Sequence, residues 1–493
     1  MTKTKKDFNK IHWTFKPKSG VTRDLVKNVV RLEYGDIPSE IIELAKGGIL
    51  DALGCMLAGS VQGSSQKVLK FARSQGGVTD CTVVCYGDRT NRYQAALVNG
   101  AFCHGWEFDD ATEYGMSCES IVVPSALAVA EKELREGHRL LTAVVLGWET
   151  IYRIGAAATW VPVKRPLHPI STFGPFGAAV ATGKLLGFRE FDMENAISLC
   201  EGQAAATLQT TQTGGDVARL HGGFAGSYGV RCAYMAREGL SGAREILEGN
   251  SGFFSCVCGL RDDDKTPRYE VEKVNEGFGK KWLMEGVTFK KYPVGEGQLG
   301  LIEEITKLRD KNKIKAEEVE EVVIGSNLSS GGWMDSTIRV PREEDVYGAQ
   351  RSMAWGVGMA MVVGSNDIAA YKNNVPPYGR SAEIAKFIDR VKVVDNEEVN
   401  RRGPFFQKIT IRLKEGKTIE GEADWPKGNY RHNPMSWEDL EGKFREQAGI
   451  AGLCEQKQER VIGMVKELEN VNDVGELMYN LVCENEREGR NIK

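Results

Sequence analysis

Apolar residues recur at every third or fourth position through the first half of the chain, a spacing typical of helices that bury one face. The segment from Asp36 to Glu40 supplies a helix start signal, and an apolar run over 41–60 follows it. Further helices are predicted over 99–106, 120–133, 140–157, 172–186, 194–206 and 222–237. These segments are rich in Ala and Gly, whose small side chains let helix axes approach closely. The pattern therefore predicts one large, all-helical bundle domain over residues 21–275.

A different pattern begins after a charged stretch near residue 265, and it predicts a smaller α+β domain over residues 276–428. Alternating residues predict strands over 319–324, 405–413 and 418–423, the last two joined as a hairpin. Amphipathic segments within 429–493 predict C-terminal helices that pack back on the helical domain. Residues 1–20 are expected to form a loosely docked N-terminal arm. The predicted fold class is thus mostly α.

The composition excludes several classes of function. The formal net charge of the 493 residues is −4, which gives no electrostatic footprint for nucleic acid. No apolar run approaches the roughly 18 residues that span a bilayer, and the basic N-terminus lacks the apolar core of a secretory signal. The 11 cysteines contain no CxxC pair, so we expect a reduced, cytoplasmic protein with neither a disulfide framework nor a metal site. The chain also lacks Walker, GxSxG and HExxH motifs.

The first candidate site is the segment from His104 to Asp110, where a histidine precedes two adjacent carboxylates, Asp109 and Asp110. Such a group could bind a metal ion, orient a base or hold an arginine. Because adjacent carboxylates repel, at least one of them needs a cation or a hydrogen-bond donor. Helix capping with an ion pair explains the same residues, and no third metal ligand follows at a standard spacing.

The second candidate is His168, which lies between two prolines just before a Gly-rich apolar segment. Ser171 or Thr172 can cap the helix predicted there, and the N–H groups at its start would favour an anionic ligand. His168 would then be placed to act as a general acid or base. The alternative is a histidine in a solvent-facing loop.

The third candidate is the segment from Asp216 to Gly223, which contains Arg219 and His221. An arginine can hold a carboxylate through two parallel hydrogen bonds, although an ion pair with Asp216 competes for Arg219. His221, beside two glycines, could approach a ligand or make an interhelical hydrogen bond.

The fourth candidate is the segment 289–298, where Lys290, Lys291 and Tyr292 precede a proline and two glycines. Such a turn could present a cation and a phenol to a cleft between the domains. Alternatively, the two lysines are simply solvated.

Taken in order along residues 22–485, these motifs resemble the MmgE/PrpD family, which includes 2-methylcitrate dehydratase and cis-aconitate decarboxylase. The landmarks are ILDALGCMLAGS (49–60), NGAFCHGWEFDD (99–110), VVPSALAVAE (122–131), LHPISTFGPFGAAVATGKLLG (167–187), LHGGFAGSYGV (220–230) and FKKYP (289–293). The resemblance implies a helical domain completed by the C-terminal helices, an α+β lid domain, a homodimer and a site between the two domains. It also implies small di- or tricarboxylate substrates and no cofactor.

The chain departs from the family pattern at several positions. Asp109, Asp110 and His168 match, but the decarboxylases carry other residues at four places: Asp at Glu107, Thr at Ala111, His at Ser117 and Lys at Ala218. The missing Lys and His would bind carboxylate or move protons. Either Arg219 and Lys291 take over with a different substrate, or the catalytic set has diverged.

The resemblance implies a cofactor-independent lyase, most closely a 2-methylcitrate dehydratase-like dehydratase or a related decarboxylase. Its chemistry develops negative charge beside a carboxylate, so the site must supply cations, hydrogen-bond donors, an acid and a base. We assign catalysis to His168, Asp109, Lys291 and Tyr292, and substrate binding to Arg219, His104, Asp110, His221, Ser171 and Ser117. Two alternatives stay open: an isomerase or epimerase on a dicarboxylate such as iminodisuccinate, and a non-catalytic carboxylate-binding homologue.

Overall fold

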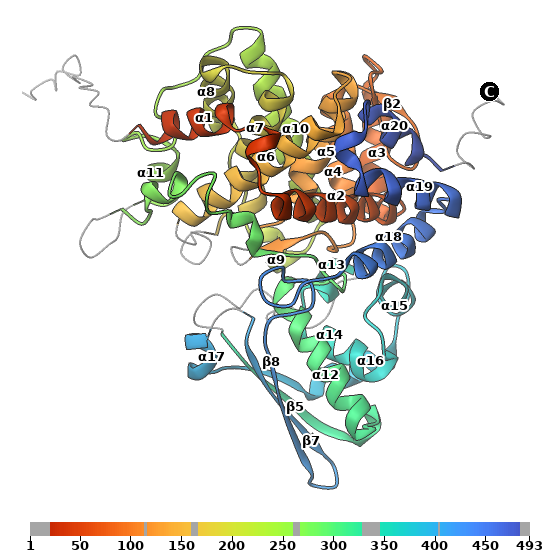
Figure 1. Cartoon of the computed structure of the whole chain (residues 1–493). Helices are drawn as coiled ribbons and strands as arrows, with labels where there is room; N and C mark the ends of the chain where they lie inside the picture. The colour runs from red at the N-terminus through yellow and green to blue at the C-terminus, as the bar shows by residue number, and fades with distance from the viewer. Residues whose placement is uncertain are drawn as a thin grey trace, which may run out of the picture.

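The computed structural model shows a large helical body and a smaller α+β lid beneath it (Figure 1). It describes residues 20–112, 116–158, 166–259, 267–327, 346–402 and 405–483; the predicted arm lies outside these ranges apart from Gly20. Helices dominate and the sheets are small, which confirms the predicted mostly-α fold.

The first part of the chain forms most of the helical body. Its helices are Val21–Arg31 (α1), Ser39–Ser60 (α2), Gly63–Gln75 (α3), Arg92–Cys103 (α4), Glu119–Lys132 (α5), Gly137–Ala157 (α6), Pro169–Leu185 (α7), Glu190–Leu199 (α8), Gln209–Thr213 (α9), His221–Arg237 (α10) and Phe253–Val257 (α11). Two short ribbons accompany them: Cys81–Thr82 (β1) with Arg89–Thr90 (β2), and Ala111–Thr112 (β3) with Val287–Thr288 (β4). Helix α6 is long and apolar enough to cross a membrane, but its apolar 18-residue stretch is entirely buried inside this body.

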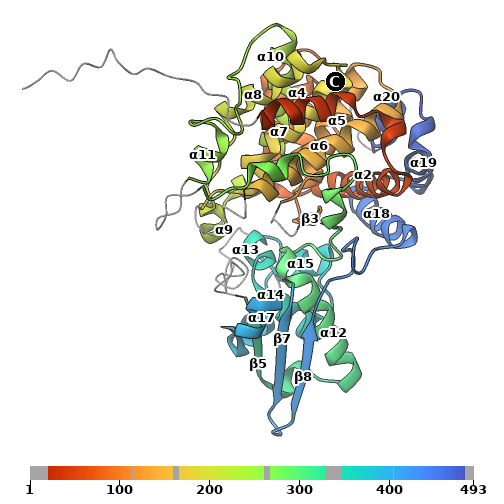
Figure 2. The same ribbon diagram turned by 60° about the vertical axis from the view of Figure 1, so that its left-hand side comes forward.

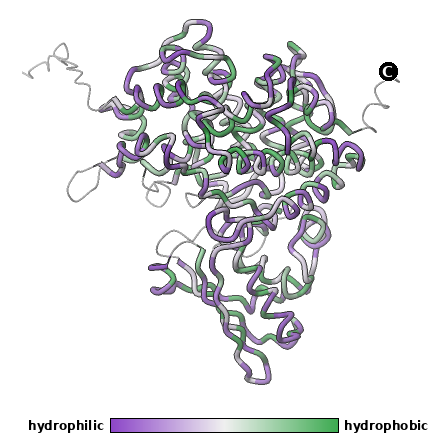
Figure 3. Tube along the Cα trace, in the orientation of Figure 1, coloured by the Kyte–Doolittle hydropathy of each residue, from purple (hydrophilic) through white to green (hydrophobic). Residues whose placement is uncertain are grey.

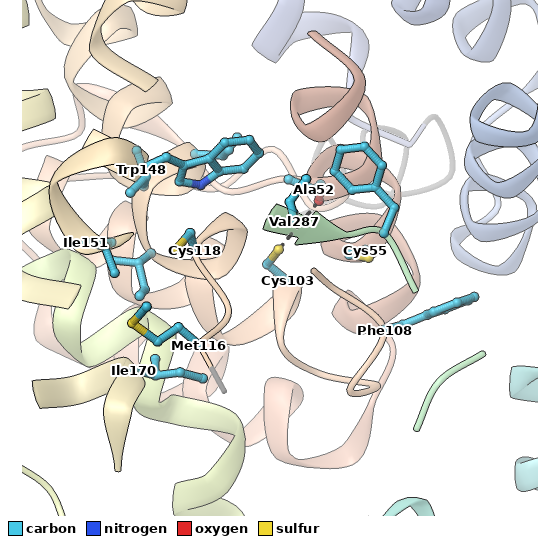
Figure 4. Close-up of a cluster of buried hydrophobic side chains, with 14 of the residues drawn as sticks. Ala52, Cys55, Cys103, Phe108, Met116, Cys118, Trp148, Ile151, Ile170 and Val287 are labelled. Atoms are coloured by element: carbon cyan, nitrogen blue, oxygen red, sulfur yellow. Dashed lines mark hydrogen bonds between the residues drawn. The ribbon is translucent and has the colours of Figure 1, made fainter. Parts of the chain in front are cut away.

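The helices of this body approach one another at backbone distance where glycine faces the neighbour. A Cβ added at Gly223 of α10 would lie 2.2 Å from the Leu97 carbonyl of α4, and one at Gly59 of α2 would lie 1.7 Å from the Phe102 carbonyl. No other residue fits these crossings without moving a helix. The close approach buries a continuous apolar core, part of which Figure 4 shows with side chains of α2, α4, α6 and β4 in one cluster.

The lid is built on a four-stranded sheet in the order β6-β5-β7-β8. Its strands are Val319–Ser326 (β5), Val391–Asp395 (β6), Gln407–Leu413 (β7) and Thr418–Ala423 (β8), and its helices are Leu299–Asn312 (α12), Val346–Gln350 (α13), Met353–Gly358 (α14), Ile368–Asn374 (α15), Ala382–Phe387 (α16) and Glu397–Arg402 (α17). Strands β7 and β8 form the predicted hairpin, which projects away from the helical body (Figure 2).

Two predicted elements need correction. The helix expected over 194–206 spans Glu190–Leu199 and continues only as a 3-10 turn over Cys200–Gly202; farther on, the Ala206 carbonyl accepts the amide of His168 at 2.9 Å. Strand β6 was not predicted, since only its first residue is buried and the alternation that marks a strand is missing.

The chain returns to the helical body at its end. The helices Trp437–Ala451 (α18), Glu455–Lys466 (α19) and Val474–Asn480 (α20) lie on that body, and α18 packs along α2. Coloured by hydropathy, the apolar positions gather where the helices of the body cross, and the tip of the hairpin is hydrophilic (Figure 3).

Candidate active site

The short ribbon of β3 and β4 brings two sequence motifs together. Ala111 pairs with Thr288 and Thr112 with Val287, in antiparallel register. This pairing sets the loop that precedes β3, residues 104–110, beside the segment that follows β4. We call residues 104–110 the site loop.

Glu107 is the centre of a buried group of charges. Its carboxylate lies 3.0 Å from Nη1 of Arg351, 3.3 Å from Nε2 of His104, 3.7 Å from Nζ of Lys290 and 3.9 Å from Nη1 of Arg219. Burial alone would favour the protonated acid, but Lys290, His104 and the two arginines outweigh it and lower the pKa of Glu107. The carboxylate is therefore ionised, and it holds three cations from distant parts of the chain in one place.

His104 is held between two carboxylates. Its Nδ1 lies 2.9 Å from Asp109 and its Nε2 lies 3.3 Å from Glu107, and all three side chains are buried. Burial favours the neutral ring, but Asp109 and Glu107 outweigh it and raise the pKa of His104. Because each ring nitrogen faces a carboxylate, the site favours the imidazolium, which can donate a proton or attract an anion.

Arg219 connects the helical body with the lid. It lies on a 3-10 turn over Asp216–Leu220 and donates to Oε1 of Gln350, in α13, at 2.5 Å. Nε2 of Gln350 in turn donates to the Trp106 carbonyl at 2.7 Å and the Pro293 carbonyl at 2.8 Å. Asp216, the predicted competitor for Arg219, pairs with Lys67 at 2.8 Å on the surface.

His168 and His221 form a stacked pair beside these charges. Their ring centroids are 4.0 Å apart, and Nδ1 of His221 lies 2.8 Å from the hydroxyl of Ser171. Burial, followed by the charge of His221, lowers the pKa of His168, and burial followed by His104 lowers that of His221 to about 4. Both rings are neutral at pH 7. Nδ1 of His168 meets no hydrogen-bond partner within the described ranges, which leaves it able to accept a proton.

The start of α7 differs from the prediction. The helix begins at Pro169 with His168 as its N-cap residue, so neither Ser171 nor Thr172 caps it. Thr172 donates to the His168 carbonyl at 2.8 Å, and Ser171 bonds His221 as described. The proline decides this, because its fixed φ suits the first helical position. For His221, the interhelical hydrogen bond is the interpretation that the structure supports.

Asp110 and Ser117 hold the site loop to α5. The Asp110 carboxylate accepts the amides of Cys118 at 3.0 Å and Glu119 at 2.9 Å, and the Ser117 hydroxyl donates to the Asp110 carbonyl at 2.8 Å. Burial and the charge of Asp109 raise the pKa of Asp110 to about 7. The two adjacent carboxylates thus have separate partners, as their repulsion requires.

The structure does not bring Lys291 and Tyr292 to this group. The Lys291 side chain is 47% exposed and lies 3.8 Å from Glu303, and its ammonium lies 5.3 Å from the Tyr292 ring centroid. Lys290 occupies the position at the site that was expected of Lys291. It is 2% exposed and donates to the Glu107 carbonyl at 3.1 Å. Successive residues of an extended segment point to opposite sides, so only one of the two lysines can face the site loop.

Three further residues of the site were not singled out in the sequence: Glu107 as its centre, and Gln350 and Arg351 of the lid. Glu107 has a φ of 56°, a conformation that non-glycine residues rarely adopt and that is typical of functional sites. Nothing in the local sequence marks Gln350 and Arg351, because their contacts cross about 240 residues.

One group within the described ranges has the make-up of a metal site. Ligand atoms of Asp51, Cys55 and Glu119 lie within 4.8 Å of one another. The ammonium of Lys443 is 2.7 Å from Asp51, however, and already supplies the positive charge there. Glu119 of this group also accepts the amide of Asp110, at the end of the site loop, at 3.1 Å.

The fold and the site define a two-domain protein in which a helical body and an α+β lid close around a buried, predominantly cationic centre. The sequence model of the MmgE/PrpD N-terminal domain matches residues 23–265, and that of the MmgE/PrpD C-terminal domain matches residues 292–470. The chain belongs to the MmgE/PrpD family.

Several curated proteins are similar over nearly their whole length. A cis-aconitate decarboxylase-like protein of Aspergillus oryzae, oryM, is 27% identical over 94% of this chain and 97% of its own. A cis-aconitate decarboxylase of Aspergillus terreus is 27% identical over 98% and 99%, and that of Homo sapiens is 23% identical over 92% of each chain.

Proposed function

We propose that this protein is a lyase that acts on a small tricarboxylate bound at the Glu107 centre. The observation that carries the proposal is the excess of positive charge there. Lys290, Arg219, Arg351 and the His104 imidazolium surround Glu107, with Asp109 behind His104. A buried surplus of cations is costly unless an anion neutralises it, and a polycarboxylate does so with several charges at once.

The same charges suit a reaction that leaves an electron pair next to a carboxylate. As that pair moves onto the carboxylate oxygens, fixed guanidinium and ammonium groups stabilise the developing charge more strongly in a buried site than in water. Arg219 and Arg351 offer planar pairs of donors, and Lys290 a point charge. The chain's own side chains thus supply the electrostatic part of the reaction.

Decarboxylation is the first candidate, and the named activity of the curated relatives supports it. In this step the bond to one carboxylate carbon breaks and CO₂ leaves. The electron pair passes into the adjacent unsaturated carboxylate, and a proton from an acid completes the new C–H bond. His104, as an imidazolium, is our candidate for that acid.

Dehydration is the second candidate, because the site holds both a neutral and a protonated histidine. His168 would take the proton from the carbon next to a carboxylate. The carbon–oxygen bond would then break, and His104 would give its proton to the departing hydroxyl, which leaves as water. Decarboxylation needs no such base, so the pair of histidines favours this alternative.

To test the proposal, the protein is incubated in D₂O with cis-aconitate, citrate or 2-methylcitrate. The release of CO₂ and the formation of products are followed by NMR. Release of CO₂ identifies a decarboxylase, and loss of water from a hydroxy acid identifies a dehydratase. If water is lost, H168A should abolish that reaction, because dehydration needs the base; if CO₂ is released, H168A should leave most of the activity, because decarboxylation does not. Deuterium exchange alone would indicate an isomerase, and binding without turnover a non-catalytic homologue; either result overturns the proposal.

A further inference from the structure

The backbone of the site loop is held by side chains from remote segments. The Trp106 carbonyl accepts from Gln350 of the lid at 2.7 Å, and the Glu107 carbonyl from Lys290 at 3.1 Å. The next carbonyl, Phe108, accepts from Nζ of Lys443, in α18, at 2.9 Å. The loop therefore takes its shape from contacts made by the lid, by the segment after β4 and by a C-terminal helix.

Lys443 reaches this loop from a buried position. It is 8% exposed, and its ammonium lies 2.7 Å from Oδ1 of Asp51 in α2 and 4.2 Å from the centroid of the Phe108 ring. Burial disfavours its charge, but Asp51 outweighs this and raises the pKa of Lys443. The buried ammonium thus joins α18, α2 and the site loop at one atom.

A second acid, Glu119 of α5, connects Asp51 to the site loop. Its Oε2 accepts the Asp110 amide at 3.1 Å, and it belongs to the group of ligand atoms within 4.8 Å of Asp51. Its other oxygen, Oε1, meets no donor within the described ranges as long as both acids are ionised. A proton held between the two carboxyls gives Oε1 a partner and removes one of two buried negative charges.

We propose that Lys443, Asp51 and Glu119 are positioning residues that fix the site loop from behind, with one proton shared by Asp51 and Glu119 and residing on Glu119. Burial and then Asp51 raise the pKa of Glu119 well above its usual value. Burial raises the pKa of Asp51 too, but the Lys443 ammonium, 2.7 Å from Asp51, opposes that rise and so favours the proton on Glu119. The other titratable groups that face this pair are thiols and loop carboxyls, none of which supplies a positive charge: Cys55 on α2, Cys103 on α4, Cys118 before α5, and Asp109 and Asp110 on the loop.

The shared proton predicts opposite outcomes for two substitutions of nearly equal volume. Glu119→Gln carries a permanent N–H donor toward Asp51 and should keep the Tm within about 2 °C of the original. Asp51→Asn leaves the Lys443 ammonium buried without its carboxylate and should lower the Tm by roughly 5 °C or more. A loss with E119Q as large as that with D51N, or no loss with D51N, overturns the shared proton.

The positioning role is tested with Lys443→Met against Lys46→Met. Lys46 also joins α2 to the C-terminal segment from a buried position, through Glu43, Glu469 and the Lys466 carbonyl, but it does not touch the site loop. In K443M we expect faster amide hydrogen exchange in peptides that cover 104–110 and kcat about 10-fold lower at a nearly unchanged KM. K46M should change neither. Equal exchange in the two variants overturns the role.

The kinetic part of this test rests on the proposed function, whereas Tm and hydrogen exchange do not. If the protein turns over none of the tricarboxylates, the proposed function fails while the exchange and Tm comparisons still decide the positioning role. If K443M does not fold, the comparison of D51N with E119Q still decides the shared proton.

Discussion

Single residues decide which of several similar side chains takes part in the site. Lys290 and Lys291 are neighbours of identical chemistry, yet only Lys290 enters the Glu107 centre. The sequence could name the pair but not choose between its members, because the choice depends on how β4 pairs with β3. Glu107, likewise, stood in a recognised motif, but its role became visible only with the four cations around it.

The two lysines give a matched pair of variants. Lys290→Met removes a buried charge from the centre, and we expect kcat/KM for the tricarboxylate substrate to fall at least ~100-fold. Lys291→Met removes a half-exposed charge and should stay within about 3-fold of the original. Steady-state kinetics on the two proteins measures the difference. Comparable losses in the two variants would show that the buried charge of Lys290 contributes no more to the reaction than that of Lys291.

Glu107→Gln tests whether this carboxylate balances the cations. Without it, Lys290, Arg219 and Arg351 lose a shared buried counter-charge, so the unliganded protein should have a lower Tm. A bound polycarboxylate would then replace that charge, and citrate should bind roughly 10-fold more tightly by calorimetry. Glu303→Gln, which affects Lys291 outside the centre, serves as the control. Weaker citrate binding by E107Q would contradict the charge balance.

The ends of secondary-structure elements position the residues of the site. Helix α7 begins at a proline just after His168, and Asp110 accepts the first amides of α5. The helices and the hairpin were predictable because their periodicity is local. Strand β6 was not, because pairing with distant backbone decides it. The ribbon of β3 and β4, which assembles the centre, is only two residues long on each side and leaves no pattern in the sequence.

The burial of Asp110 beside Asp109, at the start of α5, makes stability depend on pH. Its folded pKa of about 7 lies above the ordinary value near 4 of an unfolded aspartate, so the folded state binds the proton more tightly. This contribution is fully present below about pH 4 and is lost as the pH rises through 7. Asp110→Asn should therefore gain Tm relative to the original protein between about pH 5 and pH 8. Parallel Tm curves for the two proteins would contradict this assignment.

At the scale of the whole molecule, the site exists because two domains meet. Arg351 and Gln350 come from the lid, and His104, Glu107 and Arg219 from the helical body. The resemblance to a family led to the expectation of a site between the domains, but it did not indicate which lid residues enter it. Those contacts join residues that are far apart in the sequence, and a single sequence does not reveal which distant residues touch.

Gln350 offers a test of the contact between the domains. Gln350→Ala removes a buried amide that bonds Arg219, Trp106 and Pro293, and we expect kcat/KM to fall about 10- to 100-fold. Asn366→Ala removes a buried amide that, among the residues the structure describes, bonds only the Gly356 carbonyl, within the lid. This variant should have a lower Tm but an unchanged kcat. Kinetics and thermal unfolding of both variants separate the two effects, and an unchanged kcat/KM in Q350A would argue against a coupled site.

The packing of α18 on α2 also has a consequence for the chain during its synthesis on the ribosome. Lys443 and Asp51 are 392 positions apart, and at roughly 5–20 residues per second a ribosome needs on the order of 20–80 s to cover that distance. During this interval the nascent chain displays the apolar flank of α2 that α18 will later cover. Chaperone occupancy of emerging chains should therefore begin soon after residue 60 leaves the exit tunnel and end only when the last helices appear.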